Sequence, residues 1–90
     1  MQIMKRNPMN KVNLLFFATL KDLAGTRRTE IELEPGMDVA TFKTRLPDHF
    51  PKLQPALSSV LVSINREFAF DQDEIPEGAE IALFPPVSGG

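Results

Sequence analysis

Two adjacent prolines near the end of the chain, Pro85 and Pro86, limit where its folded part can end. Proline has no backbone N–H to donate and cannot continue a central strand, so the apolar alternation of residues 80–84 must stop near Phe84. Both prolines favour an extended backbone, and six extended residues reach roughly 20 Å. The sequence therefore predicts a folded domain that ends at Phe84 and a C-terminal arm over residues 85–90.

The arm ends in two glycines, Gly89 and Gly90. Because glycine has no Cβ, the last peptide units and the α-carboxylate of Gly90 can enter a channel too narrow for any other residue. A carboxylate delivered in this way indicates chemistry on it, which makes Gly90 the candidate reactive residue and Gly89 the residue that gives it access. A terminus without any role is the competing interpretation. The spacer that positions the glycines consists of Pro85, Pro86, Val87 and Ser88.

The composition is that of one small acidic domain. The chain has 90 residues, 42% of them hydrophobic, a net charge of -2 and a pI near 5.3. Nucleic-acid binding normally requires a basic excess, which argues against that function. With no cysteine, the chain has no thiol nucleophile and no thiolate metal ligand. No apolar stretch approaches the roughly 20 residues of a membrane span, and no signal peptide is recognised, so we expect no membrane contact and a cytoplasmic location.

The first half of the domain predicts two strands around a short helix. Residues 11–18 are apolar on both faces, as in a central strand. Residues 19–24 have helical spacing, and Gly25 follows as a C-cap. Residues 29–34 alternate, with glutamates on the outward face. These glutamates are more simply a solvated strand face than a metal or acid–base site.

The main helix is predicted to begin after Asp38, a typical N-cap residue. Pro47 is expected to break or kink this helical region. The one histidine, His49, has no predicted partner beside it, so a structural or solvent role is favoured over catalysis. The apolar residues expected to face the core are Val39, Phe42, Leu46, Leu53 and Leu57.

A hairpin is predicted from residues 60–65 and 68–70. The acidic stretch 71–74 lacks the glycine and the following ligands of a calcium loop, so we interpret it as a solvated turn. Asp71 and Gln72 are then turn formers. No other cluster suggests a ligand set, and no metal site is expected.

Taken in chain order, these elements predict an α+β fold. A mixed sheet with its main helix across one face is the ubiquitin-like β-grasp arrangement. The domain would cover residues 11–84. A loose N-terminal extension over residues 1–10 would precede it, because those residues are polar and aperiodic.

A family resemblance is carried by VNLLFFATLKDLAG at residues 12–25, by the hairpin near Asn65, by GAEIA at 78–82 and above all by FPPVSGG at 84–90. Together these stretches resemble the small-subunit family of molybdopterin synthase. The resemblance implies a sulfur carrier with a β-grasp fold. It further implies that a ubiquitin-activating-type adenylyltransferase uses ATP to adenylate Gly90 and that sulfur from a persulfide then replaces the nucleotide. Residues 1–10 and the proline-broken helix depart from the family pattern.

The same resemblance implies a partner, the large synthase subunit, in a heterotetramer of two small and two large subunits. On the large subunit, the thiocarboxylate formed at Gly90 would donate its sulfur to a cyclic pyranopterin precursor of the molybdenum cofactor. We expect the large subunit to dock on the helix-free face of the sheet, at Phe17, Ala82 and Phe84. For Phe17, cover by a local loop of this chain is an equally open alternative. The chain would bind no cofactor and act as a reagent, since it offers neither a cysteine nor a convergent acid–base pair.

Three alternatives stay open at this point. A thiazole-pathway sulfur carrier would use the same tail with a different acceptor. A ubiquitin-like modifier would use the same activated glycine but end on a lysine side chain. A plain interaction domain with an idle tail would undergo no ATP-dependent modification.

Overall fold

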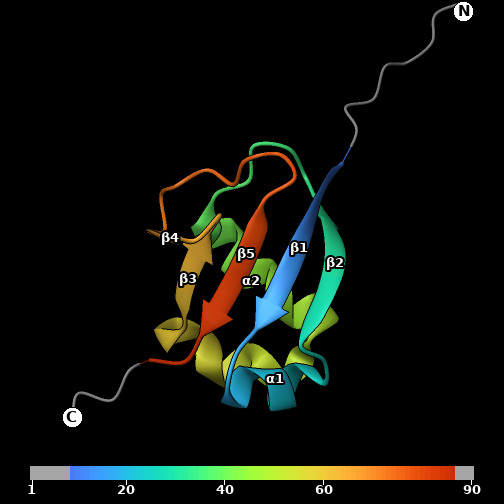
Figure 1. Ribbon diagram of the computed structural model, residues 1–90, viewed down its shortest axis with the longest axis vertical. Coiled ribbons are helices and arrows are strands. Elements are labelled where there is room, and N and C mark those ends of the chain that lie inside the picture. Colours follow the sequence, from blue (N-terminus) through green and yellow to red (C-terminus); the bar gives the residue numbers. More distant parts are fainter. Residues whose placement is uncertain (1–8, 87–90) are drawn as a thin grey trace, which may run out of the picture.

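The computed structural model describes residues 9–86. A five-stranded sheet has the order β2-β1-β5-β3-β4, and α2 crosses one of its faces (Figure 1). The central strands β1 and β5 run parallel, while the other pairs are antiparallel. This is the ubiquitin-like β-grasp fold that the sequence predicts. In chain order the elements are β1 (Asn10–Phe16), α1 (Thr19–Ala24), β2 (Arg28–Leu33), α2 (Val39–His49), the 3-10 helix η1 (Pro51–Ser59), β3 (Leu61–Ile64), β4 (Glu67–Ala69) and β5 (Glu80–Phe84).

The core lies between α2 and the sheet face that it covers. Strand alternation sends every second side chain of β1 and β5 to this face, where each apolar one is at most 2% exposed. Burying one such side chain stabilises the fold by about 1.5–3 kcal/mol. The residues that meet there from β1, β5 and α2 are Val12, Leu14, Phe16, Ile81, Leu83, Val39, Phe42 and Leu46.

The predicted order of two strands around a short helix is confirmed, but β1 ends at Phe16, two residues before the end of the predicted range. The central position of β1 agrees with its apolar run, and Gly25 caps α1 in the left-handed conformation, with its N–H donating to Lys21 O. Strand β2 lies at the sheet edge, beginning and ending one residue before the predicted range. The glutamates Glu30, Glu32 and Glu34 are exposed, as expected for a solvated face.

The N-terminal boundary of the domain lies one residue earlier than predicted. Asn10, assigned from the sequence to the loose extension, already belongs to β1 and is only 5% exposed. Its side chain donates to Pro76 O at 3.1 Å and accepts from Gly78 N–H at 2.8 Å. Those two bonds satisfy its polar atoms and hold the loop that leads into β5. Residues 1–8 lie outside the described part of the chain.

The helix break was predicted at the wrong place. Helix α2 continues through Pro47 to His49 and ends at Phe50, whose φ of -136° is not helical. Pro47 lies in the last turn, so it removes one late hydrogen bond and does not interrupt a long helix. Leu46 stays helical because its side chain is packed in the core at 1% exposure. The predicted burial of Leu53 and Leu57 is confirmed, on η1.

Helix α2 has the predicted N-cap. Asp38 Oδ1 accepts a hydrogen bond from Thr41 N–H at 2.9 Å. The bonds from Thr41 favour the ionised carboxylate, so they lower the pKa of Asp38 below its usual 3.8. A pKa depressed by folding means that the cap contributes fully above the pKa of the unfolded chain. That contribution is lost as the pH falls through the folded-state pKa.

We expect Asp38→Ala to lower the melting temperature at pH 7. The difference in melting temperature between variant and parent should shrink below about pH 4, because the Asp38 carboxylate of the parent then takes up a proton. Asp38→Asn is the matched control, because an amide still caps a helix but does not titrate; its melting should depend less on acid. Circular-dichroism melts from pH 7 to pH 2 measure both effects. An Asp38→Ala difference that is constant over this range would contradict the assignment.

Candidate functional site

Strand β5 directs the end of the chain out of the sheet. It lies between β1 and β3, and the carbonyl oxygen of its Leu83 accepts from Phe17 N–H at 3.1 Å. The strand ends at Phe84, as predicted, and Pro85 and Pro86 continue outside regular structure. The predicted roles of Val87, Ser88, Gly89 and Gly90 fall outside the described residues and stay predictions.

Two of the three predicted interface residues stack on each other at the root of the arm. The rings of Phe17 and Phe84 lie 4.7 Å apart between centroids, with an angle of 13° between their planes. Phe17 is 43% exposed, so no loop of the described chain covers it, and Phe84 is half-buried. Such a pair contributes about 0.5–1.5 kcal/mol beyond its buried area. The stack therefore fixes the direction in which the chain leaves β5.

The third predicted residue, Ala82, forms the floor of a hollow on the helix-free face. The hollow measures about 480 Å³, and both stacked phenylalanines line it. Across the sheet, Ala82 is in register with Leu15 on one side and Ser63 on the other, and Ser63 is in register with Phe68. Ala82 and Ser63 are each only 8% exposed and carry small side chains. The larger neighbours rise around them, which makes the sheet surface concave.

One end of this hollow is polar. The turn between β3 and β4 has positive φ at both Asn65 and Arg66, 52° and 73°, as in the tight turns of two-residue hairpins. Asn65 Oδ1 accepts from Glu80 N–H at 3.0 Å, and Arg66 Nε lies 3.5 Å from Glu80 Oε1. Both interactions tie the hairpin to the start of β5. The hollow thus has an apolar end at the arm and a charged end at the hairpin.

Five residues of the hollow were not predicted as interface residues from the sequence. The β1 alternation could have identified Leu15, because it has the same parity as Phe17. The position of Phe68 depends on the β3–β4 register, and that of Ser63 on its pairing with β5, neither of which a local pattern reveals. Phe68 is the most exposed large apolar side chain of residues 9–86, at 69%. The lining residues missed were Leu15, Ser63, Arg66, Phe68 and Glu80.

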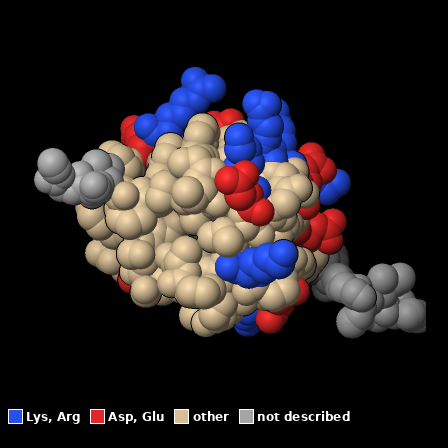
Figure 2. All heavy atoms as spheres, turned by 90° about the horizontal axis from the view of Figure 1, so that it is seen from below, with Lys and Arg blue, Asp and Glu red and all other residues tan. Residues whose placement is uncertain are grey.

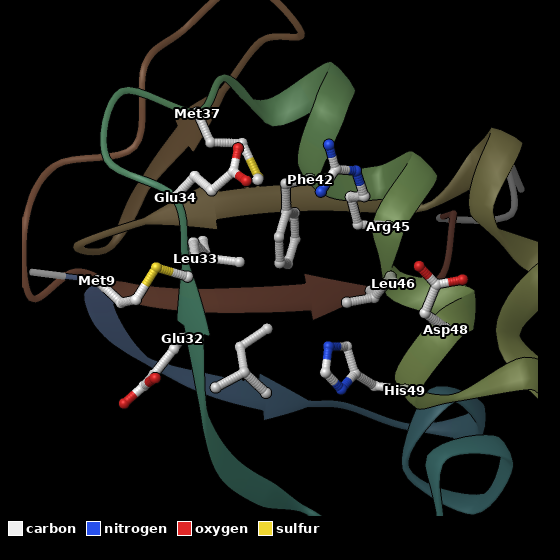
Figure 3. A pocket seen from close by; sticks show the side chains of 11 residues that line it. Met9, Glu32, Leu33, Glu34, Met37, Phe42, Arg45, Leu46, Asp48 and His49 are labelled. Atoms are coloured by element: carbon white, nitrogen blue, oxygen red, sulfur yellow. The ribbon is translucent and has the colours of Figure 1, made fainter. Parts of the chain in front are cut away.

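A smaller cleft lies between β2 and α2 (Figure 3). It measures about 130 Å³, and its floor is apolar, with Leu33 from β2 and Phe42 and Leu46 from α2. His49 is exposed at its rim, beside Arg45. Neither side chain makes a hydrogen bond or ion pair within residues 9–86. The prediction that His49 has a structural or solvent role instead of a catalytic one is not tested by the structure and stays a prediction.

The acidic stretch 71–74 is a turn, as predicted. Asp71 pairs with Lys43 Nζ at 3.1 Å, and Asp73 Oδ2 accepts from Phe70 N–H at 2.8 Å. Two of its carboxylates are therefore engaged in holding the turn. Over residues 9–86, no three His, Cys, Asp or Glu side chains are grouped so that they could hold a metal ion. None of the helices in that range is long and apolar enough for a membrane crossing.

The similarity of this chain to known proteins covers both the hollow and the arm. A protein-family model described as the ThiS family matches residues 14–90. The chain belongs to the ThiS family. A curated relative from Mycobacterium tuberculosis, named molybdopterin synthase sulfur carrier subunit, is 31% identical over 83 residues, covering 91% of this chain and 100% of the relative.

Two solved structures show the same fold as this ThiS-family chain. The small archaeal modifier protein SAMP1 from Haloferax volcanii has a TM-score of 0.77 and 28% identity, covering 89% of this chain and 99% of its own. A putative molybdopterin converting factor, subunit 1, from Pyrococcus furiosus has a TM-score of 0.77 and 26% identity, covering 87% and 99%. This chain thus resembles both a protein named as a sulfur carrier subunit and one named as a protein modifier.

Proposed function

We propose that this chain is the sulfur carrier subunit of molybdopterin synthase. The observation that carries the proposal is the full-length match to the relative of that name from Mycobacterium tuberculosis, which aligns over 100% of its length. The FPPVSGG ending, residues 84–90, supplies the terminal glycine that a carrier needs. The fold supports the same role, because β5 leads directly into this ending and Phe84 is fixed by its stack on Phe17.

The partner in this proposal is the large subunit of the synthase, in a complex of two small and two large subunits. Its docking site is the helix-free face around the hollow that Phe17, Ala82 and Phe84 line. An exposed apolar surface with a polar edge is the usual composition of such interfaces. Because Phe84 lines the hollow and directly precedes the arm, docking there would bring the start of the arm to the partner.

The chemistry requires activation of Gly90, since a free carboxylate is a poor electrophile. A carboxylate oxygen of Gly90 attacks the α-phosphorus of ATP on a separate adenylyltransferase, and pyrophosphate leaves. The terminal sulfur of a protein persulfide then attacks the acyl carbon, AMP leaves, and a second thiol cleaves the resulting acyl disulfide to free the thiocarboxylate. This chain has no cysteine, so every thiol in the sequence of steps belongs to a partner.

The test is the mass of the tail. Incubation with the adenylyltransferase, ATP and a sulfur donor should replace one C-terminal oxygen by sulfur. Oxidation of any of the four methionines adds nearly the same mass, so fragment ions must assign the change to Gly90, or alkylation must trap the new nucleophilic sulfur. A mass change found only on methionine would contradict the carrier role.

A second candidate function is protein modification, which the 28% identity to the Haloferax volcanii modifier favours. The same adenylate would then be attacked by a lysine amine, giving an isopeptide in place of a thiocarboxylate. Cell extract supplied with tagged chain and ATP separates the two outcomes: a modifier yields higher-mass conjugates, whereas a carrier yields none. A thiazole-pathway carrier would form the thiocarboxylate but give no pterin product with the large synthase subunit.

A further inference from the structure

A second hollow lies at the β4 edge of the sheet. It measures about 630 Å³, and its lining includes Leu61 from β3, Phe68 and Phe70 beside β4, and Lys43 from α2. Phe68 also lines the hollow of about 480 Å³ around Ala82 on the helix-free face, which is called the first hollow from here on. The ring of Phe68 therefore stands as a ridge between two concave surfaces.

The short length of β4 creates this second hollow. The strand has three residues, and its last register pair with β3 joins Ala69 to Val62. The chain then turns toward α2, where Asp71 O accepts from Ala40 N–H at 3.0 Å. Leu61, the first residue of β3, consequently has no strand partner on that side within the described chain. A concave surface remains where a longer β4 would have continued the sheet.

The second hollow has the composition of a docking surface. Phe68 and Phe70 are 69% and 66% exposed, more than any other large apolar side chain of residues 9–86. Phe70 is held in place by its N–H bond to Asp73, and the Lys43–Asp71 ion pair forms a polar border. Figure 2, which views the molecule from below, shows a broad uncharged area on its left side, with most Lys and Arg side chains elsewhere in the view. Apolar centres with charged borders are typical of protein interfaces.

We infer that the large subunit binds both hollows, passing over Phe68 and taking Phe70 as a second anchor. The inference rests on the proposed function and extends its docking site around the β4 edge. The two hollows are continuous because both are lined by Phe68. A protein seated in the second hollow must therefore also cover a residue of the first hollow, which identifies the occupant of both as the large subunit. One partner with two apolar projections, one on each side of the Phe68 ring, fills both surfaces without competition. Aromatic anchors of this kind carry most of the binding energy of an interface.

The test compares Phe70→Ser, Phe84→Ala and Met9→Ala for binding to the purified large subunit by titration calorimetry. Phe70→Ser should weaken binding at least about tenfold, the effect of losing one aromatic anchor. Phe84→Ala, at the first hollow, should weaken it as well. Met9→Ala is the control, since Met9 is 47% exposed but lies at the start of β1, next to the opposite sheet edge. Its affinity should equal that of the parent.

Thermal melting separates docking from folding. Phe70 is largely exposed, so Phe70→Ser should melt within a few degrees of the parent. If Phe70→Ser unfolds, Phe70→Leu is measured in its place, because leucine keeps an apolar side chain. Phe70→Leu should lose less affinity for the large subunit than Phe84→Ala. Unchanged affinity for Phe70→Ser beside a loss for Phe84→Ala overturns this inference and leaves the proposed function standing. Unchanged affinity for both variants removes the proposed interface itself.

Other occupants of the second hollow give distinct results. A second copy of this chain would show as a dimer in sedimentation that Phe70→Ser dissociates. Docking of the adenylyltransferase alone would show as a loss of adenylation with unchanged affinity for the large subunit. Either result overturns the inference.

Discussion

Removal of Gly90 should leave the domain folded and the synthase complex assembled, while sulfur transfer falls by at least about 100-fold. Deletion presents the carboxylate of Gly89 about 3.5 Å short of its place, and near-attack geometry tolerates errors of only about 1 Å. Adding one alanine after Gly90 should fail for the opposite reason, because it lengthens the arm and brings a Cβ to the channel that we expect to admit only glycine. The change lies beyond Pro86, outside every packed element of the described domain.

Three measurements check this expectation. Melting temperature and calorimetric affinity for the large subunit should stay near the parent values, since residues outside a packed core shift stability by less than about 0.5 kcal/mol. Mass spectrometry should show that adenylation or thiocarboxylate formation is lost. Met9→Ala serves as the control for handling and should retain full product formation. Parental product formation by either tail variant would show that the position of Gly90 is not the source of function.

Ala82→Arg should abolish docking with little effect on the fold. Ala82 is the floor of the first hollow, so an arginine there fills the concave surface and brings a charge to the centre of the interface. Burying an unpaired charge against a partner costs several kcal/mol, and we expect affinity for the large subunit to fall at least about 100-fold. The long side chain can extend along the hollow to water, so melting should change far less than binding.

The controls for Ala82→Arg separate shape from charge. Ala82→Ser keeps a small side chain at the floor and should bind within a few-fold of the parent. Gln54→Arg adds the same charge on η1, at an exposed position outside the hollow, and should bind normally. If Ala82→Arg binds as well as Gln54→Arg, the helix-free face is not the docking site.

The sequence predicts elements best where local chemistry decides them. Pro85 marks the end of β5 to the residue, and Gly25 and Asp38 mark helix ends through their caps. The effect of Pro47 was misjudged because the packing of Leu46 against the sheet outweighs a local backbone preference. Local preference is a weak guide wherever a buried side chain anchors the same turn.

The hollow on the helix-free face could be predicted only in part, because some of its residues are far apart in the sequence. Strand parity alone places Phe17 and Phe84 on the helix-free side. The hollow between them also needs the register that sets Ser63 beside Ala82 and Phe68 beside Ser63. Pairing register between strands depends on turn geometry and core packing across the whole domain, so it is not readable from alternation. The second hollow was missed for the same reason, since it depends on where β4 stops.

The parallel pairing of β1 with β5 has a consequence for how the protein is made. Asn13 and Glu80 are register partners although 67 positions separate them (80 minus 13), so the middle of the sheet joins its first and last strands. Such long-range closure cannot occur on the ribosome until β5 has emerged, and it is slow compared with local hairpin formation. Nascent or truncated chains therefore lack the root from which the arm projects. Activating enzymes that require this root would meet only chains in which β5 has already been synthesised and paired.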